Sequence, residues 1–240
     1  MTNILIFGAS RGLGAAFSSG LPARRDTVWL VSRSQPENLE RNDGVERVWI
    51  KADLSSPKDA SRTISEALSE QRLDVLIYNA GIWEEQAFKS DYSFEEVSIE
   101  ESENIIAVNL TSAIICIQKL LSNLKQSDNA KIILIGSTSG LENSGSQEVA
   151  YAASKFGLRG LGHALRENLR KYGITVTCIN PGEVAAEVAY EDGVERAIEA
   201  YAGTRIPVRD LILIVKCLMG LSKVACVKEI DIPAITDLNA

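Results

Sequence analysis

Short apolar runs alternate with longer helical patterns along the sequence, and this alternation constrains the fold more than any other feature. Several runs are apolar at nearly every position, as expected for strands covered on both faces of a parallel sheet. Such alternation is typical of right-handed βαβ units. The sequence therefore predicts an α/β fold with a doubly wound, mostly parallel, seven-stranded sheet. We expect the strands at residues 3–7, 27–31, 46–50, 73–78, 131–136, 174–179 and 227–232.

The helical patterns fall between these runs and leave no stretch that resembles a linker or a repeat, so we expect a single domain over residues 1–240. Two polar connections, 83–100 and 182–203, follow expected strand ends, where open α/β sheets bind their ligands. Their acidic residues are also common on any solvated surface. We expect the helices at residues 12–23, 57–70, 101–124, 150–172, 193–202 and 208–221.

The net charge of the chain limits the kinds of molecule that it is expected to bind. The chain has 25 Lys and Arg against 32 Asp and Glu, a net charge of -7. Nucleic acids and anionic membranes need a basic stripe, so neither is expected as a partner. The apolar run 3–7 meets Gly8 directly and does not resemble a signal peptide, and the apolar stretch 211–221 is too short to span a bilayer. We expect a cytoplasmic protein.

The cysteines and the histidine do not suggest a metal site. Cys116, Cys178, Cys217 and Cys226 lie far apart, each in an apolar stretch. This pattern predicts four buried, reduced thiols, with neither a disulfide nor a bound metal. His163 is the only histidine and has no second ligand or triad partner, so we expect a structural role for it.

A glycine-rich turn, Gly8-Ala9-Ser10-Arg11-Gly12-Leu13-Gly14, joins the first expected strand to the first expected helix. Glycines permit a tight turn and let backbone N–H groups approach a pyrophosphate, and the helix N-terminus favours the anion. The spacing differs from the standard dinucleotide fingerprint, and a glycine triplet alone is a weak signal. Its position in the α/β pattern predicts a Rossmann-type cofactor site with contacts from Gly8, Ser10, Arg11, Gly12, Leu13 and Gly14.

Tyr151 and Lys155 are four residues apart in an expected helix. Four residues advance a helix by about 400°, which places both side chains on one face. The ordinary pKa of tyrosine, about 10, is too high for a general acid/base at neutral pH, and a nearby cation lowers it. A Tyr and a Lys four residues apart are also common on the exposed surface of a helix, so this pair alone does not indicate a function.

Taken together, these motifs make the chain resemble the short-chain dehydrogenase/reductase family up to about Pro181. The shared motifs occur in the family's order and spacing, and six of them are present: Gly8-x-x-x-Gly12-x-Gly14, Asn79-Ala80-Gly81, Asn109, Ser137, Tyr151-x-x-x-Lys155 and Pro181-Gly182.

The resemblance implies a role for each catalytic residue. Tyr151 would exchange a proton with the substrate oxygen while hydride passes to or from a nicotinamide. Lys155 would bind the nicotinamide ribose and lower the pKa of Tyr151, and Asn109 would hold a water that relays protons to solvent. Ser137 would orient the substrate carbonyl; its neighbours, Thr138 and Ser139, are competing hydroxyls.

The resemblance also indicates the cofactor. Many NAD-dependent relatives have an Asp near Ser32, whereas here Arg33 follows and Arg11 lies in the glycine turn, so NADP(H) is expected rather than NAD(H). Both arginines could also be ordinary surface residues. The remaining cofactor contacts implied by the resemblance are Ser32, Asp53, Leu54, Asn79, Ala80, Gly81, Tyr151, Lys155, Pro181 and Gly182.

Three positions depart from the family pattern. Phe7 stands where many relatives have Thr, Tyr78 replaces the first of two Asn residues, and Ala186 stands where many have a Thr that binds the nicotinamide carboxamide. Residues 225–240 also lack the frequent glycine-rich ending. These departures indicate a divergent member.

The resulting hypothesis is an oxidoreductase that interconverts a carbonyl and an alcohol on a small or medium substrate, such as a ketone or a 3-oxoacyl compound. Residues 182–203 would cap the substrate. The alternative is a non-catalytic NADP(H)-binding redox sensor or scaffold. A homodimer or homotetramer through helices 101–124 and 150–172 is expected by analogy, because their apolar residues exceed one core-facing stripe, for instance Ile114, Ile115, Leu158 and Leu161.

Overall fold

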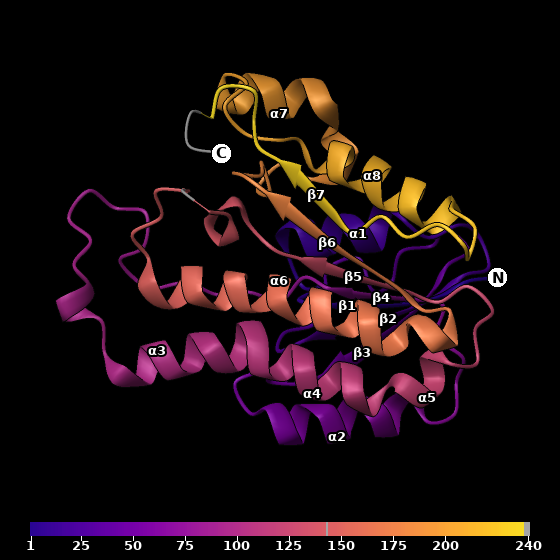
Figure 1. Cartoon of the computed structure of the whole chain (residues 1–240). Helices are drawn as coiled ribbons and strands as arrows, with labels where there is room; N and C mark the ends of the chain where they lie inside the picture. Colours follow the sequence, from indigo (N-terminus) through magenta and orange to yellow (C-terminus); the bar gives the residue numbers. More distant parts are fainter. Residues whose placement is uncertain (143, 238–240) are drawn as a thin grey trace.

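The computed structural model describes residues 1–142 and 144–237. Its strands form one sheet in the order β3-β2-β1-β4-β5-β6-β7, and every pair of neighbours is parallel (Figure 1). The predicted doubly wound, seven-stranded sheet is therefore confirmed. The strands are β1 Asn3–Phe7, β2 Thr27–Ser32, β3 Glu46–Lys51, β4 Val75–Tyr78, β5 Lys131–Ile135, β6 Thr175–Pro181 and β7 Glu229–Ile232.

Helices cover both faces of the sheet, as expected where every residue of β1, β2, β4 and β5 is buried. On one side lie α1 Gly12–Gly20, α7 Gly193–Tyr201 and α8 Val208–Gly220 (Figure 1). On the other side lie α2 Pro57–Leu68, α3 Ile99–Ile106, α4 Ser112–Lys119, α5 Leu121–Leu124 and α6 Val149–Leu169.

The helix expected over residues 101–124 is not one regular helix. A π-helical turn, η2 Ala107–Thr111, separates α3 from α4, and α5 follows as a separate short helix. A π-turn is a local widening that leaves the apolar periodicity of the sequence almost unchanged, which explains why the pattern did not reveal it.

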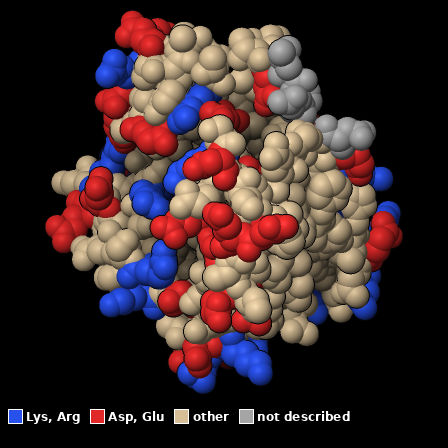
Figure 2. Space-filling model, turned by 90° about the vertical axis from the view of Figure 1, so that its left-hand side faces the viewer, with Lys and Arg blue, Asp and Glu red and all other residues tan. Residues whose placement is uncertain are grey.

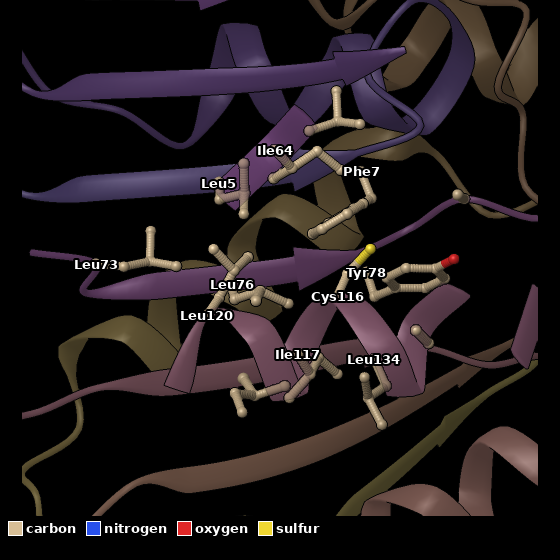
Figure 3. Packing of buried hydrophobic residues seen from close by; sticks show 14 of the residues in the cluster. Leu5, Phe7, Ile64, Leu73, Leu76, Tyr78, Cys116, Ile117, Leu120 and Leu134 are labelled. Carbon is tan, nitrogen blue, oxygen red and sulfur yellow. The ribbon is translucent and has the colours of Figure 1, made fainter. Parts of the chain in front are cut away.

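Two of the departures from the family pattern pack against each other in the core. Phe7 in β1 and Tyr78 in β4 are Cα partners in the sheet, and their ring centroids lie 4.9 Å apart (Figure 3). Both side chains are fully buried. The Tyr78 hydroxyl donates a hydrogen bond of 2.5 Å to the Val108 carbonyl, within the π-turn. The aromatic pair therefore joins the two central strands to the helix layer.

The prediction of four buried thiols is wrong at two positions. Cys116 and Cys178 are buried, but Cys217 and Cys226 are exposed. The buried residues of α8 include Leu211, Val215 and Leu218, so Cys217 falls on the solvent side of that helix. Cys226 lies in the connection before β7, which begins at Glu229 rather than at residue 227. The apolar residues around Cys217 and Cys226 did not indicate whether these side chains face the core or the solvent.

Because all seven strands are parallel, their carboxyl ends meet at one edge of the sheet, on the left in Figure 1. The glycine-rich turn follows β1, Asn79 follows β4, Ser137 lies close after β5 and Gly182 follows β6. Figure 2 looks onto this edge and shows Asp and Glu side chains gathered near its centre. The predicted functional residues therefore lie where open α/β sheets bind ligands.

Candidate active site and cofactor cleft

The glycine-rich turn packs tightly against the end of β4. The N–H of Gly8 donates to the Val31 carbonyl at 2.9 Å, and Asn79 Nδ2 donates to the Gly8 carbonyl at 3.2 Å. A Cβ at Gly14 would lie 1.9 Å from the Gly8 oxygen and 2.9 Å from Asn79 Nδ2. Only glycine fits there, so helix α1 begins directly against the end of the first strand.

The start of α1 suits a phosphate. Arg11 precedes the helix, and its side chain makes no capping hydrogen bond, so the first backbone N–H groups of α1 are available to an anion. A cleft of about 400 Å³ opens over this end of the helix. It is lined by the turn and α1, by Glu37, Asn38 and Arg41, and by residues 186–191. These features fit a dinucleotide cofactor.

The predicted adenosine side is partly exposed and partly engaged in internal contacts. Ser32 is buried; its hydroxyl donates to the Ser34 carbonyl at 2.7 Å and accepts from Trp49 Nε1 at 3.1 Å. Arg33 and Asp53, by contrast, are exposed at the ends of β2 and β3. The exposed side chains of Arg33 and Asp53 can therefore reach a ligand. The Ser32 hydroxyl, in contrast, already makes hydrogen bonds within the protein.

The segment after β6 folds back over the turn. Gly182 donates its N–H to the Ile232 carbonyl at 3.0 Å, which fixes the start of the segment beside β7. Farther along, Glu191 forms an ion pair with Arg41, from the connection between β2 and β3. A Cβ at Gly12 would lie 3.4 Å from the Ala186 Cβ. This segment therefore forms one wall of the cleft above α1.

Helix α6 brings the predicted catalytic pair together at the same edge. Tyr151 and Lys155 are both buried, and the Lys155 ammonium lies 5.5 Å from the centroid of the Tyr151 ring. Lys155 Nζ donates a hydrogen bond of 3.0 Å to the Ile135 carbonyl at the end of β5. The contact joins helix α6 to β5, the strand that leads to Ser137.

Ser137 completes the group. It precedes a 3₁₀ turn, Thr138–Gly140, and its Oγ accepts the Ser139 N–H at 3.1 Å. Its hydroxyl also lowers the pKa of the Tyr151 phenol. A Cβ at Gly140 would lie 2.9 Å from the backbone carbon of Lys155, so this turn packs closely on α6. Of the three neighbouring hydroxyls, the one at Ser137 lowers the pKa of the phenol.

The electrostatic surroundings oppose ionisation of both partners in the chain alone. Burial raises the pKa of Tyr151 above its ordinary value of 10.0; Glu148 and Glu84 also raise it, while the Ser137 hydrogen bond lowers it. Burial lowers the pKa of Lys155 to about 8. A low pKa for Tyr151 is thus not a property of the chain by itself, and bound cationic charge would have to supply it.

Asn109 lies within the π-turn, a feature often found at functional sites. Its Oδ1 accepts the Ile82 N–H at 2.8 Å, and its Nδ2 donates to the Ile82 carbonyl at 2.8 Å and to Ser154 Oγ at 2.9 Å. Both N–H bonds of the amide are used within the protein. A water molecule could therefore hydrogen-bond to the Asn109 side chain only through the remaining lone pair of Oδ1.

Sequence reasoning did not identify Trp83, Glu84 and Phe88 as site residues. All three lie between β4 and α3, in a connection whose length and position alone indicate a function. Glu84 is fully buried and hydrogen-bonded to the start of α6, and the rings of Trp83 and Phe88 contact the Tyr151 ring. The signal available in the sequence was the pair of aromatic residues shortly after Asn79-Ala80-Gly81.

Residues 2–196 match the family model described as short chain dehydrogenase, which covers more than half of the chain. The chain belongs to the short-chain dehydrogenase/reductase family. It is therefore an oxidoreductase of a family whose enzymes use NAD(P)(H). The part of the chain that precedes residue 197 contains every residue of the predicted catalytic group.

The curated relatives are reductases and dehydrogenases. A rhamnolipid-biosynthesis 3-oxoacyl-[acyl-carrier-protein] reductase of Pseudomonas aeruginosa is 33% identical over 189 residues, 74% of this chain and 71% of that protein. NADPH-dependent aldehyde reductase 2 of Arabidopsis thaliana is 27% identical over 204 residues, 78% of this chain and 73% of the relative. L-rhamnose 1-dehydrogenase (NADP(+)) of Thermoplasma acidophilum is 27% identical over 211 residues, 85% of this chain and 80% of the relative.

Solved structures share the fold over the full length of the chain. A short-chain dehydrogenase/reductase from Serratia marcescens aligns with a TM-score of 0.81 at 24% identity, covering 100% of this chain and 98% of that one. A 3-oxoacyl-[acyl-carrier protein] reductase from Brucella melitensis aligns with a TM-score of 0.79 at 23% identity, covering 96% and 94%. At these identities the likeness concerns the fold alone.

Within residues 1–142 and 144–237, none of the helices is both long and apolar enough to cross a membrane. The same residues contain no group of three or more His, Cys, Asp or Glu side chains arranged to hold a metal ion.

Proposed function

We propose that the enzyme interconverts a carbonyl compound and an alcohol with NADP(H), and that Tyr151 is its general acid/base. The observation that carries the proposal is the convergence of Ser137, Tyr151 and Lys155 beside the glycine-rich turn. The Ser137 hydroxyl lowers the pKa of the Tyr151 phenol, and the Lys155 ammonium lies 5.5 Å from the centroid of the Tyr151 ring. The names of the relatives, which are reductases and dehydrogenases, agree with this chemistry.

The bound cofactor would supply or accept the hydride. In the reduction direction, Tyr151 Oη would give its proton to the carbonyl oxygen as negative charge develops there. Ser137 would donate a hydrogen bond to the same oxygen and fix its position, as donors aimed at a developing oxyanion do. Lys155 would bind the nicotinamide ribose, and its charge would favour the phenolate of Tyr151.

Asn109 has a positioning role in this proposal. Its amide holds both backbone groups of Ile82 and the hydroxyl of Ser154, which in turn donates to the Tyr151 carbonyl at 2.6 Å. These contacts join the connection after β4 to the catalytic turn of α6. The water relay to solvent would use the lone pair of Oδ1 that remains.

For the cofactor, we favour NADP(H) over NAD(H). Arg33 is exposed at the end of β2, and Arg11 is exposed in the turn before α1, so both guanidinium groups are free to pair with a 2′-phosphate. No carboxylate follows β2 directly where it would repel that phosphate. Two relatives whose names specify NADPH or NADP(+) support this preference.

We also propose that residues 182–203 form the cap of a single catalytic domain that spans residues 1–240. The position of residues 186–191 on the wall of the cleft supports this role.

A homodimer or homotetramer remains our expectation for the assembly. Leu158 turned out to belong to the core, but Ile114 on α4 and Phe156 on α6 are 44% and 42% exposed. Light scattering that gives the mass of a monomer at micromolar concentration would contradict the assembly.

The decisive experiment is NADPH and NADH oxidation against a panel of carbonyl compounds. Turnover should fall by about 10²–10⁴-fold in Tyr151→Phe, since this variant loses only the phenol proton. Ser137→Ala should also lose most activity, whereas Thr138→Ala serves as its matched control and should keep it. Binding of NADPH without turnover of any compound would instead favour a non-catalytic cofactor-binding protein.

A further inference from the structure

Two aromatic rings, those of Trp83 and Phe88, contact the Tyr151 ring. The centroid of the Trp83 ring lies 6.2 Å from that of Tyr151, and the centroid of the Phe88 ring lies 5.8 Å from it. Trp83 and Phe88 also contact each other, at 6.0 Å. All three contacts are edge-to-face, with interplanar angles of 88°, 87° and 65°. The two rings thus form an apolar wall beside the phenol.

The wall is open to solvent while the tyrosine is not. Tyr151 is 9% exposed, whereas Trp83 is 56% exposed and Phe88 is 59% exposed. Both rings are therefore accessible to a carbonyl compound that places its oxygen at the phenol. Large exposed apolar side chains beside a reactive group are typical of a ligand-binding surface.

The backbone holds the Phe88 ring in place against its own preference. Phe88 has φ 63°, in the left-handed region that a bulky side chain rarely adopts. Its N–H donates to Glu148 Oε1 at 3.0 Å, and Glu148 lies directly before α6. Strain of this kind persists where the surroundings enforce it, and it clusters at functional sites. Glu148 thereby couples the ring to the helix that carries Tyr151.

The charges around the wall are mainly negative. Glu84 and Glu148 are buried beside the start of α6, and both raise the pKa of Tyr151. Lys155 is the cation that faces the same ring. A substrate with its own negative charge would be repelled on its way to the phenol.

We propose that Trp83 and Phe88 select carbonyl compounds with an uncharged aromatic ring next to the carbonyl. The inference rests on the proposed carbonyl reduction and narrows its substrate class. An aryl ring can extend the edge-to-face arrangement of the wall, which stabilises it beyond the burial of its area. A saturated ring of the same size gains the burial alone.

The test compares two ketones that differ in aromaticity, acetophenone and cyclohexyl methyl ketone. The readout is the ratio of their kcat/KM values with NADPH, because intrinsic reactivity cancels when the ratio is compared between variants. Trp83→Ala should lower the ratio by about threefold to tenfold, the size expected for lost ring–ring contacts. Phe88→Gly should act in the same direction, and glycine accepts the φ of this position without strain.

Phe94→Ala is the matched control. Phe94 lies on the same connection and is 54% exposed, yet its ring makes no contact with Tyr151 in the described part of the chain, so the ratio should not change. A third compound, 4-acetylbenzoate, tests the charge: its kcat/KM should be lower than that of acetophenone, and Glu148→Gln should narrow the gap.

The outcomes separate the two proposals. An unchanged ratio in both Trp83→Ala and Phe88→Gly, with wild-type turnover of either ketone, would overturn the aromatic selection alone. Absence of turnover of every carbonyl compound by the wild-type enzyme would overturn the proposed function and the selection with it. Because both side chains are more than half exposed, thermal melting should confirm that the variants remain folded.

Discussion

Glu84 Oε1 accepts a hydrogen bond of 3.2 Å from the backbone N–H of Tyr151, the proposed general acid/base. The same oxygen accepts the Ala150 N–H at 2.8 Å, while Oε2 is buried and has no hydrogen-bond partner within the described residues. A carboxylate at a helix N-terminus satisfies free N–H groups and interacts favourably with the helix dipole. Glu84 therefore fixes the turn of α6 that carries Tyr151 and places a negative charge near it.

Glu84→Gln should shift the pH dependence of alcohol oxidation to lower pH. Glutamine keeps one carbonyl oxygen for the two N–H groups but removes the charge that raises the pKa of Tyr151. The phenolate then forms at lower pH, so kcat/KM for the alcohol rises earlier in a pH titration with NADP⁺. Glu85→Gln is the control on the exposed neighbour. A profile that stays in place, or moves to higher pH, would contradict this electrostatic role.

Lys155→Met should abolish activity and yet stabilise the cofactor-free protein at pH 7. Burial lowers the pKa of Lys155 from 10.5 to about 8, so the folded state binds fewer protons than the unfolded state between these values. Folding stability from this group is therefore lost as the pH falls through 8 and recovered as it rises toward 10.5.

We expect Lys155→Met to gain roughly 2 kcal/mol at pH 7, since each pKa unit is worth about 1.4 kcal/mol and the Ile135 carbonyl loses its donor. Urea unfolding at pH 7 and at pH 10 measures the difference. The gap between wild type and variant should narrow at the higher pH; a gap that is constant or widens would show that burial of the ammonium is not its cause.

Gly14→Ala should remove NADPH binding, because its Cβ would lie 1.9 Å from the Gly8 oxygen and force the turn apart. Gly160→Ala is the matched change in α6, where a Cβ has no neighbour within 4 Å. It should stabilise the protein by up to about 1 kcal/mol through helix propensity. Isothermal titration with NADPH and thermal melting test both variants. Normal NADPH binding by Gly14→Ala would refute the account of the turn.

Arg33→Ala should raise the KM for NADPH by about tenfold while leaving that for NADH nearly unchanged, as expected when one charge-assisted contact to a phosphate is lost. Arg62→Ala, on the exposed side of α2, removes the same charge away from the cleft and should change neither value. Equal effects on both cofactors would place Arg33 away from the 2′-phosphate.

The sequence predicted the sheet and the grouping of the site well, because both depend on local patterns. β1 has the predicted bounds, and Gly8, Asn79 and Ser137 follow strands whose ends must meet once the sheet is parallel. Tyr151 and Lys155 share a face for the same kind of reason, since helix geometry fixes residues four positions apart.

The surroundings of Tyr151 could not be predicted in this way. The burial of Glu84 and the left-handed backbone of Phe88 arise because a long connection folds onto the start of a helix more than 60 residues later. Sequence periodicity describes only neighbouring residues, so it cannot predict a contact between segments that are this far apart in the chain. The raised pKa of Tyr151 has the same origin, since it depends on burial and on Glu84 and Glu148.

The contact between Phe7 and Tyr78 has an evolutionary consequence. Changing Tyr78 to Asn alone would leave Phe7 facing a cavity and place an amide in a fully buried position, and changing Phe7 to Thr alone would leave Tyr78 without its ring partner. We expect each single reversal to give a less stable protein, and the effects of the two changes to be non-additive because the side chains are in contact. Relatives with an aromatic residue at one position should carry one at the other, and the pair can mark a lineage within the family.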